Sequence, residues 1–183
     1  SESIVKRAQE KNLVEIEIVN IRDFALDSYG TVDGRPYGGG AGMVLRVDVL
    51  AKVFERISIP RHTILTSAKG KKYIQADVKR LQSYDHIVLL AGHYEGVDER
   101  AMQYIDEEIS IGDFILTGGE LACATIVDSV VRLIPGVLKK DSATAEESFF
   151  FISIEDLRQA IESHPVLDML VKKGTKEVQL LEY

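Results

Sequence analysis

Three short apolar runs constrain the fold of this 183-residue chain most strongly, because a turn containing glycine follows each of them. The runs lie at 63–66, 87–91 and 108–111, and segments with the apolar spacing of helices separate them. This alternation is typical of an α/β fold in which helices cover both faces of a parallel sheet. Ligands of such sheets bind beyond the carboxyl ends of the strands, where the three turns would gather.

The other expected elements follow from apolar spacing and from the positions of glycine and proline. The residues between 20 and 46 are rich in glycine and read as a long loop, which in a compact domain is usually functional or mobile. Helices are expected at 3–11, 47–55, 74–81, 101–105 and 121–133, a further strand at 13–19, a helix at 154–173 broken at Pro165, and a final strand at 176–183.

Composition narrows the class of protein. No apolar run is long enough to span a bilayer and no signal-peptide pattern opens the sequence, so a cytoplasmic protein without membrane contact is expected. The single cysteine, Cys123, excludes an intramolecular disulfide and reads as a buried small side chain. A net charge of −7 excludes nucleic-acid binding through a broad basic surface and leaves local basic groups or a dimer groove.

Spacing alone predicts a ligand site with glycine walls but does not name the ligand. The glycine run at 38–42 matches neither a dinucleotide fingerprint nor a P-loop, and the four histidines are too scattered for a zinc site. Acids at 95–99 read either as a helix-start pattern or as acid–base groups, and Asp113 as a turn residue. Arg132 reads more simply as a charge at a helix C-terminus than as a catalytic group.

Several longer motifs, taken together and in order, resemble one known family. They are Arg22-Asp23-Phe24, Thr31-Val32-Asp33, Tyr37-Gly38-Gly39-Gly40-Ala41-Gly42-Met43, Gly92-His93-Tyr94-Glu95-Gly96-Val97-Asp98-Glu99-Arg100, Ile109-Ser110-Ile111-Gly112-Asp113-Phe114-Ile115-Leu116-Thr117-Gly118-Gly119-Glu120 and Arg132-Leu133-Ile134-Pro135-Gly136-Val137-Leu138. This set resembles the bacterial tRNA (guanine-N1)-methyltransferases, TrmD, of the SPOUT class. The resemblance implies a deep trefoil knot, a homodimer with its active site at the subunit interface, S-adenosylmethionine as methyl donor, and N1-methylguanosine at tRNA position 37 as product.

The resemblance also implies roles for individual residues. The expected catalytic pair is Glu147 as general base, with Glu146 as its competitor, and Arg132 as the group that stabilises charge on the guanine O6. The expected tRNA-facing residues are Arg22, Asp23, Gly38, Gly39 and Gly40. The expected cofactor-binding residues are Thr66, Ser67, Gly70, Ala91, Gly92, Tyr94, Glu95, Gly96, Ile111, Gly112, Leu116, Thr117, Gly118 and Gly119. Magnesium dependence is reported for the family, and the sequence shows no dedicated metal site.

The sequence departs from the family pattern at both ends. The family opens with a strand of the type Ile-Val-Thr-Leu-Phe-Pro-Glu and continues past a Leu-Glu-Tyr-Pro motif into a helical tRNA-binding domain, and neither part is recognised here. The expected division is a methyltransferase domain at 1–149 and an unmatched segment at 150–183. The alternative function is therefore a truncated or engineered knotted dimer that binds S-adenosylmethionine but transfers methyl groups poorly or not at all.

Overall fold

A computed structural model describes residues 3–36, 39, 42–57, 59–93 and 96–138, all within one compact unit. The expected helix and strand beyond residue 150 lie outside these ranges. The elements in chain order are α1 (Ile4–Glu10), the 3₁₀ helix η1 (Ile21–Phe24), β1 (Asp33–Gly34), β2 (Val44–Leu45), α2 (Val47–Arg56), β3 (His62–Lys72), α3 (Gln75–Leu81), β4 (Ile87–Ala91), the 3₁₀ helix η2 (Glu99–Tyr104), β5 (Glu107–Ser110) and α4 (Glu120–Val131).

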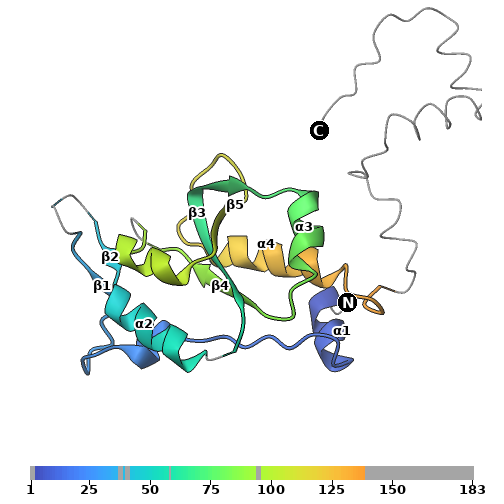
Figure 1. The fold of residues 1–183 in the computed structure, drawn as a ribbon, viewed down its shortest axis with the longest axis horizontal. Coiled ribbons are helices and arrows are strands. Elements are labelled where there is room, and N and C mark those ends of the chain that lie inside the picture. Colours follow the sequence, from blue (N-terminus) through green and yellow to red (C-terminus); the bar gives the residue numbers. More distant parts are fainter. Residues whose placement is uncertain (1–2, 37–38, 40–41, 58, 94–95, 139–183) are drawn as a thin grey trace, which may run out of the picture. The chain divides into compact units, whose positions relative to one another are not determined.

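The main sheet has the strand order β4-β3-β5, and both pairings are parallel (Figure 1). Thr66 of β3 lies opposite Ala91 of β4 and Ile109 of β5, so all three strands end at the same edge of the sheet. The parallel arrangement predicted from the alternation of apolar runs and helices is confirmed. The glycine turns therefore meet at one edge, as expected for a ligand site of this fold class.

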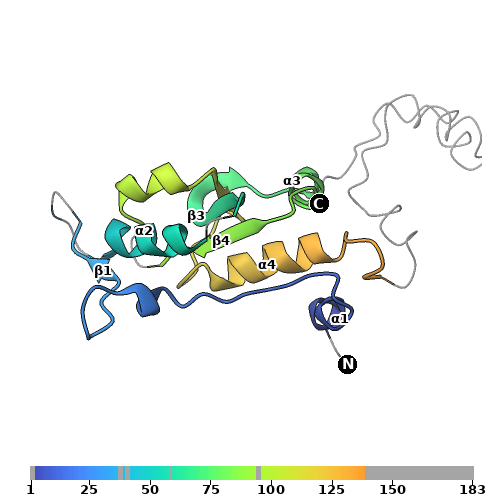
Figure 2. The ribbon, with the colours of Figure 1, turned by 60° about the horizontal axis from the view of Figure 1, so that its bottom comes forward.

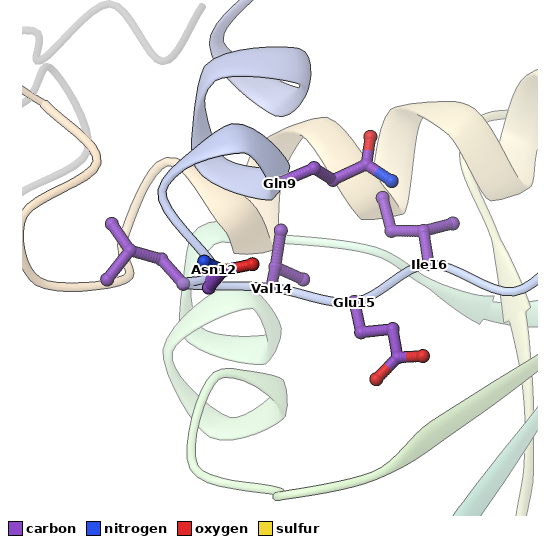
Figure 3. Close-up of a pocket in the computed structure, with 6 residues that line it drawn as sticks. Gln9, Asn12, Val14, Glu15 and Ile16 are labelled. Atoms are coloured by element: carbon purple, nitrogen blue, oxygen red, sulfur yellow. The ribbon is translucent and has the colours of Figure 1, made fainter.

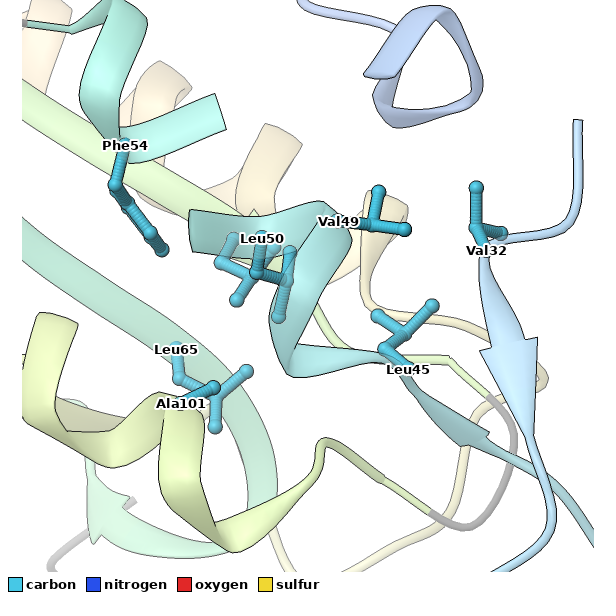
Figure 4. Packing of buried hydrophobic residues seen from close by; sticks show 8 residues of the cluster. Val32, Leu45, Val49, Leu50, Phe54, Leu65 and Ala101 are labelled. Atoms are coloured by element: carbon cyan, nitrogen blue, oxygen red, sulfur yellow. The ribbon is translucent and has the colours of Figure 1, made fainter. Parts of the chain in front are cut away.

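Helices cover both faces of the sheet because neighbouring strand residues point to opposite sides. On one face Leu65 packs with side chains from α2 and η2, in a buried cluster that includes Leu50 and Ala101 (Figure 4). On the other face Ile64 packs with Leu81 of α3 and with side chains of β5 and α4. The two-sided burial explains why these runs are continuously apolar rather than alternating.

A network of charged side chains ties α3 to the strands. The Arg80 guanidinium donates to both carboxylate oxygens of Glu107 at 2.9 Å and to Asp77 at 3.2 Å. Lys71 also donates to Asp77 at 2.8 Å, and the His62 Nε2 lies 2.6 Å from the Glu107 carboxylate. Burial opposes the ionisation of Asp77 and Glu107, but these hydrogen bonds outweigh it and lower the pKa of both carboxyl groups.

The predicted strand at 13–19 is wrong. The segment is extended, but no ladder joins it to another strand among the described residues. Its side chains alternate as the sequence suggested, with Val14 and Ile16 pointing to one side and Glu15 to the other (Figure 3). Ile18, however, is 92% exposed. Residues 9 and 12–16 line a groove of about 550 Å³. The alternation therefore reflects contact on one side, where Val14 packs with α1 and the end of α4, rather than sheet pairing. Figure 2 shows the segment running from α1 along α4 without joining a sheet.

The first predicted turn is also different from expectation. Residues 67–72 continue β3 instead of leaving the sheet, and the pairing with β5 shifts register between Thr66 and Lys71. The strand continues because Lys71 and Lys72 pair again with Ile109 and Ser110. Inside the predicted loop, β1 and β2 form a short antiparallel pair. The helix expected at 101–105 begins earlier, as η2.

Candidate functional site

The hydroxyl of Thr66, in the middle of β3, joins that strand to the end of β4. Its Oγ1 donates to the carbonyl of Leu90 and accepts from the backbone N–H of Gly92, both at 3.2 Å. The third turn is attached to the same point, because the N–H of Gly119 donates to the carbonyl of Gly92 at 2.6 Å. Thr66 is almost completely buried, so this arrangement is part of the protein interior and not a mobile rim.

Glycine at position 119 is required by the closeness of the three segments. A Cβ there would collide with Thr66 Oγ1, and would lie 2.6 Å from the Gly92 nitrogen and 3.0 Å from the Ala91 Cα. A Cβ at Gly92 would lie 2.5 Å from the Thr66 carbonyl oxygen, and one at Gly70 would lie 2.7 Å from the backbone of Glu108. Glycine therefore permits close backbone contact between the turns themselves, before any ligand is considered.

The second turn connects to both its neighbours. His93 forms an antiparallel bridge with Gly118 of the third turn. On its other side the carbonyl of Gly96 accepts from the N–H of Leu45 at 3.0 Å, and this places β2 beside the turn. Gly96 has φ +128°, which favours glycine, and a Cβ there would meet no described atom within 4 Å. The second turn is thus fixed at both ends and open beside Gly96.

The third turn is held at its start and exposes apolar side chains at its centre. The hydroxyl of Ser110 donates to the carbonyl of Gly112 at 3.0 Å, and Lys72 makes a 2.7 Å ion pair with Asp113. The side chains that follow are exposed, and Ile115 reaches 83% exposure. The exposed apolar patch consists of Phe114, Ile115, Leu116 and Leu121. Exposed apolar side chains that are close in sequence, when they form a continuous surface, mark interaction sites.

Cys123 lies on the first turn of α4 with its Sγ 3.9 Å from Thr66 Oγ1. Burial raises the pKa of its thiol, which keeps the group protonated and poorly nucleophilic at neutral pH. The expectation of an inert packed side chain therefore fits its surroundings, although the residue is only partly buried.

The acids of the second turn include a structural cap. The Asp98 carboxylate accepts from the backbone N–H of Arg100 at 3.0 Å and pairs with its guanidinium at 2.6 Å. These contacts with Arg100 lower the pKa of Asp98. Its placement agrees with the helix-start interpretation, because the residue caps η2.

The structure brings some of the expected site residues together and separates others. Thr66, Ala91, Gly92, Gly118 and Gly119 contact one another through the bonds above, with Ser67, Gly70, Gly96, Ile111, Gly112, Leu116 and Thr117 on the same three segments. Arg22 and Asp23 lie exposed on η1, and Gly39 is exposed with φ +84°. Tyr94, Glu95, Gly38, Gly40 and Glu147 lie outside the described residues.

Arg132 lies at the far end of α4 from the turns. It is the C-cap of a twelve-residue helix that begins directly after Gly119. At 1.5 Å per residue the helix axis is about 18 Å long, so one chain does not bring Arg132 to the turns along this helix. The described residues contain no group of three or more His, Cys, Asp or Glu side chains that could hold a metal ion, and none of their helices could cross a membrane.

Sequence reasoning missed the central role of the Thr66 hydroxyl. The signal that could have revealed it is a threonine at the end of an otherwise apolar strand, because a hydroxyl buried there needs a backbone partner from the neighbouring turn. It also missed the exposed apolar patch, because its residues were assigned to the third glycine turn and to the helix at 121–133 without a prediction of their exposure.

Comparison with known proteins identifies the family. Residues 1–164 match the model of the tRNA (guanine-1)-methyltransferase TrmD family. The chain is 50% identical over 151 residues to a tRNA (guanine-N(1)-)-methyltransferase of Carboxydothermus hydrogenoformans, covering 80% of this chain and 59% of that protein. It is 51% identical over 150 residues to the namesake of Syntrophomonas wolfei, covering 81% and 62%.

A solved structure gives the same answer. The crystal structure of the tRNA (m1G37) methyltransferase from Aquifex aeolicus matches with a TM-score of 0.69 and 32% identity, covering 94% of this chain and 84% of that one. The chain spans about three fifths of the length of the curated relatives it matches. From its motifs, its parallel sheet and these matches, the chain belongs to the tRNA (guanine-1)-methyltransferase family.

Proposed function

We propose that this chain transfers a methyl group from S-adenosylmethionine to N1 of guanosine at position 37 of tRNA, in the cytoplasm. The observation that carries the proposal is the meeting of strand β3 at Thr66 with two backbone turns at Gly92 and Gly119. Family membership supplies the reaction type, and the turns supply a rigid wall of backbone at the edge where parallel sheets bind ligands. The SPOUT-type trefoil knot belongs to the same proposal.

The chain's own residues fit an S-adenosylmethionine site at the turns. Gly96 has open space beside it, and the backbone of 111–117 lies at the surface next to the Gly118–His93 bridge. When bound, the cofactor supplies an electrophilic methyl group on a sulfonium sulfur. The turns would orient that group, because hydrogen bonds hold the second turn at Gly92 and Gly96 and the third turn at Gly112 and Gly119.

Proton removal is the task of the side chains. The N1 of guanine carries a proton at neutral pH, so a base must take that proton as the nitrogen attacks carbon. We assign this role to Glu147, with Glu146 as the adjacent competitor. Arg132 stabilises the negative charge that develops on O6 of the guanine. Both assignments come from the family resemblance, and they are proposals for this chain.

A homodimer would resolve the separation between Arg132 and the turns. The exposed apolar patch of the third turn and the start of α4 offers a surface for a second copy. In the proposed dimer, each active site takes its turns from one subunit and Arg132 and Glu147 from the other. The proposed dimer gives a role to both ends of α4, the apolar patch at its start and Arg132 at its end.

Methyl transfer to an unmodified tRNA that carries guanosine at position 37 tests the proposal, with N1-methylguanosine measured by mass spectrometry of the digested product. We expect Glu147→Gln and Arg132→Ala to slow transfer severely while calorimetry shows unchanged cofactor binding. Glu146→Gln is the matched control and should retain near-normal turnover. Full turnover by Glu147→Gln with loss in Glu146→Gln would exchange the two assignments.

Mixed dimers test the shared active site. Gly118→Val obstructs the cofactor turn and Arg132→Ala removes the stabilising charge, so each variant alone should be inactive. Co-expressed, they should recover part of the activity, because one of the two sites in a mixed dimer has both intact turns and an intact Arg132. Absence of recovery in isolated mixed dimers would contradict the assignment of Arg132 to the partner's site.

A second candidate function is cofactor binding with little or no methyl transfer. The net charge of −7 favours it, because an acidic chain gains little from phosphate contacts. The basic run at 69–72 does not offset this charge, since Lys69, Lys71 and Lys72 each pair with an acid of this chain. Cofactor binding without any methylated product would favour this second candidate.

A further inference from the structure

A rigid turn at 27–31 projects a single aromatic side chain into solvent. The Asp27 carboxylate accepts from the backbone N–H of Tyr29 at 2.9 Å and of Thr31 at 3.1 Å, and Gly30 takes φ +70°. The Arg22 guanidinium closes the turn from outside by donating to the carbonyl of Gly30 at 2.9 Å. The bonds from Thr31 and Tyr29 lower the pKa of Asp27, so the carboxylate that holds the turn stays ionised at neutral pH.

Tyr29 differs from the other aromatic residues of the described part of the chain. It is 92% exposed, and none of the ring-stacking or cation–π contacts among the described residues involves its ring. In contrast, Phe54 stacks on Tyr104 with a centroid distance of 5.2 Å, and Tyr84 stacks on His62 at 4.2 Å. An exposed ring on a flexible loop would need no explanation, but this ring is carried by a turn with four fixed bonds.

The turn is attached to the core that supports the candidate site. Val32, three residues after Tyr29, is buried in the same cluster as Leu45 (Figure 4). Leu45 in turn donates its N–H to Gly96 of the second glycine turn. Three residues of chain span at most about 10 Å, so Tyr29 lies close to an element bonded to the site. The segment that carries it connects η1 to β1 (Figure 2).

We propose that Tyr29 is a stacking platform for an unpaired base of the RNA loop that carries the target guanine. This inference rests on the proposed function, since it assigns a further contact to the same substrate. An exposed aromatic face suits a base taken out of the RNA stack, and stacking tolerates any base because each has a π face. Arg22 adds a cation to the same turn through its bond to Gly30, and its remaining N–H groups suit the phosphate that flanks a stacked base.

The absence of tryptophan from the sequence allows a direct test. In the full chain, Tyr29→Trp creates a single fluorescent reporter, and we expect its emission to be quenched when a synthetic stem–loop RNA of the anticodon arm is added. Tyr29→Ala should raise the dissociation constant for this RNA about 5- to 150-fold, the range that loss of one base–aromatic stack produces. Tyr29→Phe should bind like the unaltered chain, because stacking requires the ring and not the hydroxyl.

Tyr84 provides the matched control. It is the same residue type, and it lies before β4 at the opposite end of the strands from the glycine turns. We expect Tyr84→Ala to leave RNA affinity unchanged and Tyr84→Trp to show no quenching by RNA.

Three results would overturn the inference: RNA affinity equal in Tyr29→Ala and the unaltered chain, an unquenched reporter at saturating RNA, or no RNA binding by the unaltered chain. A change in the dimer equilibrium of Tyr29→Ala without a change in RNA affinity would instead identify Tyr29 as a protein contact. Failure of the proposed function has a separate signature, namely RNA binding and quenching without formation of N1-methylguanosine.

Discussion

Replacement of Gly119 by alanine tests whether the three turns are held together by close backbone contact. The residue has φ −82° and ψ −1°, a conformation that alanine adopts without strain. The obstacle is space, because the new Cβ would collide with Thr66 Oγ1 and lie 2.6 Å from the Gly92 nitrogen. The third turn would have to move away from Gly92, and the 2.6 Å hydrogen bond between Gly119 and Gly92 would lengthen or break.

The magnitude follows from three opposing contributions. Overpacking of a tight interior costs about 1–3 kcal/mol, and loss of the hydrogen bond costs about 0.5–1.5 kcal/mol. Reduced freedom of the unfolded chain offsets about 0.4–1 kcal/mol of this loss. We expect Gly119→Ala to lower the free energy of unfolding by about 2–3 kcal/mol and to weaken S-adenosylmethionine binding, because two of the turns separate.

Urea unfolding followed by circular dichroism measures the first effect and calorimetry the second. Gly118→Ala is the matched control, since its Cβ would meet side chains and no backbone: the end of Glu120, which can rotate away, and the His93 ring at 3.1 Å. We expect this control to stay within about 1 kcal/mol of the unaltered chain. Thr66→Ala should partly relieve Gly119→Ala in a double-mutant cycle by removing Oγ1. Equal stability of Gly119→Ala and Gly118→Ala would refute the argument from close contact.

Three further predictions concern the charged network and the apolar patch. Folding lowers the pKa values of Asp77 and Glu107 from their ordinary values of 3.8 and 4.5. Their contribution to stability is therefore complete above about pH 4.5 and is lost as the pH falls through the folded-state pKa values. Unfolding transitions measured at a series of acidic pH values test this. Asp77→Asn should cost about 3 kcal/mol in urea unfolding, because Asp77 is 4% exposed and pairs with Arg80, whereas a similar change at an exposed acid should cost little. Leu121→Glu should shift the chain toward monomer in analytical ultracentrifugation, and an unchanged mass would remove the patch from the proposed dimer interface.

The sequence predicted those parts of the fold in which apolar periodicity decides the structure. The run at 87–91 is apolar at every position and the run at 63–66 has an apolar centre between two threonines, a pattern typical of strands covered on both faces. Helix α2 was predicted at nearly its observed bounds, because Val49, Leu50, Val53 and Phe54 repeat with helical spacing and are all buried. Gathering of the glycine turns at one edge followed from the parallel order alone.

Prediction from sequence failed where backbone pairing between distant segments determines the structure. The alternation at 13–19 satisfied the pattern of a strand, but a strand also needs a partner, and sequence does not show where a partner lies. The polar residues at 67–72 resembled a turn because their side chains are largely exposed, yet their backbone pairs with β5 after a register shift. Local patterns report which side chains are buried, whereas backbone pairing depends on segments distant in sequence.

In the candidate site, too, sequence predicts the position of the turns but not the contacts between distant segments. Its turns could be located from sequence, since a glycine after a buried strand marks a place where backbone must come close to something. The glycines of these segments lie directly against neighbouring protein backbone, because a Cβ at Gly119 or Gly92 would meet protein atoms. Arg132, in contrast, lies at the other end of α4, about 18 Å along the helix axis from the turns. The proposed dimer would place the Arg132 of a second copy beside the turns, so the length of α4 supports the dimer independently of the resemblance.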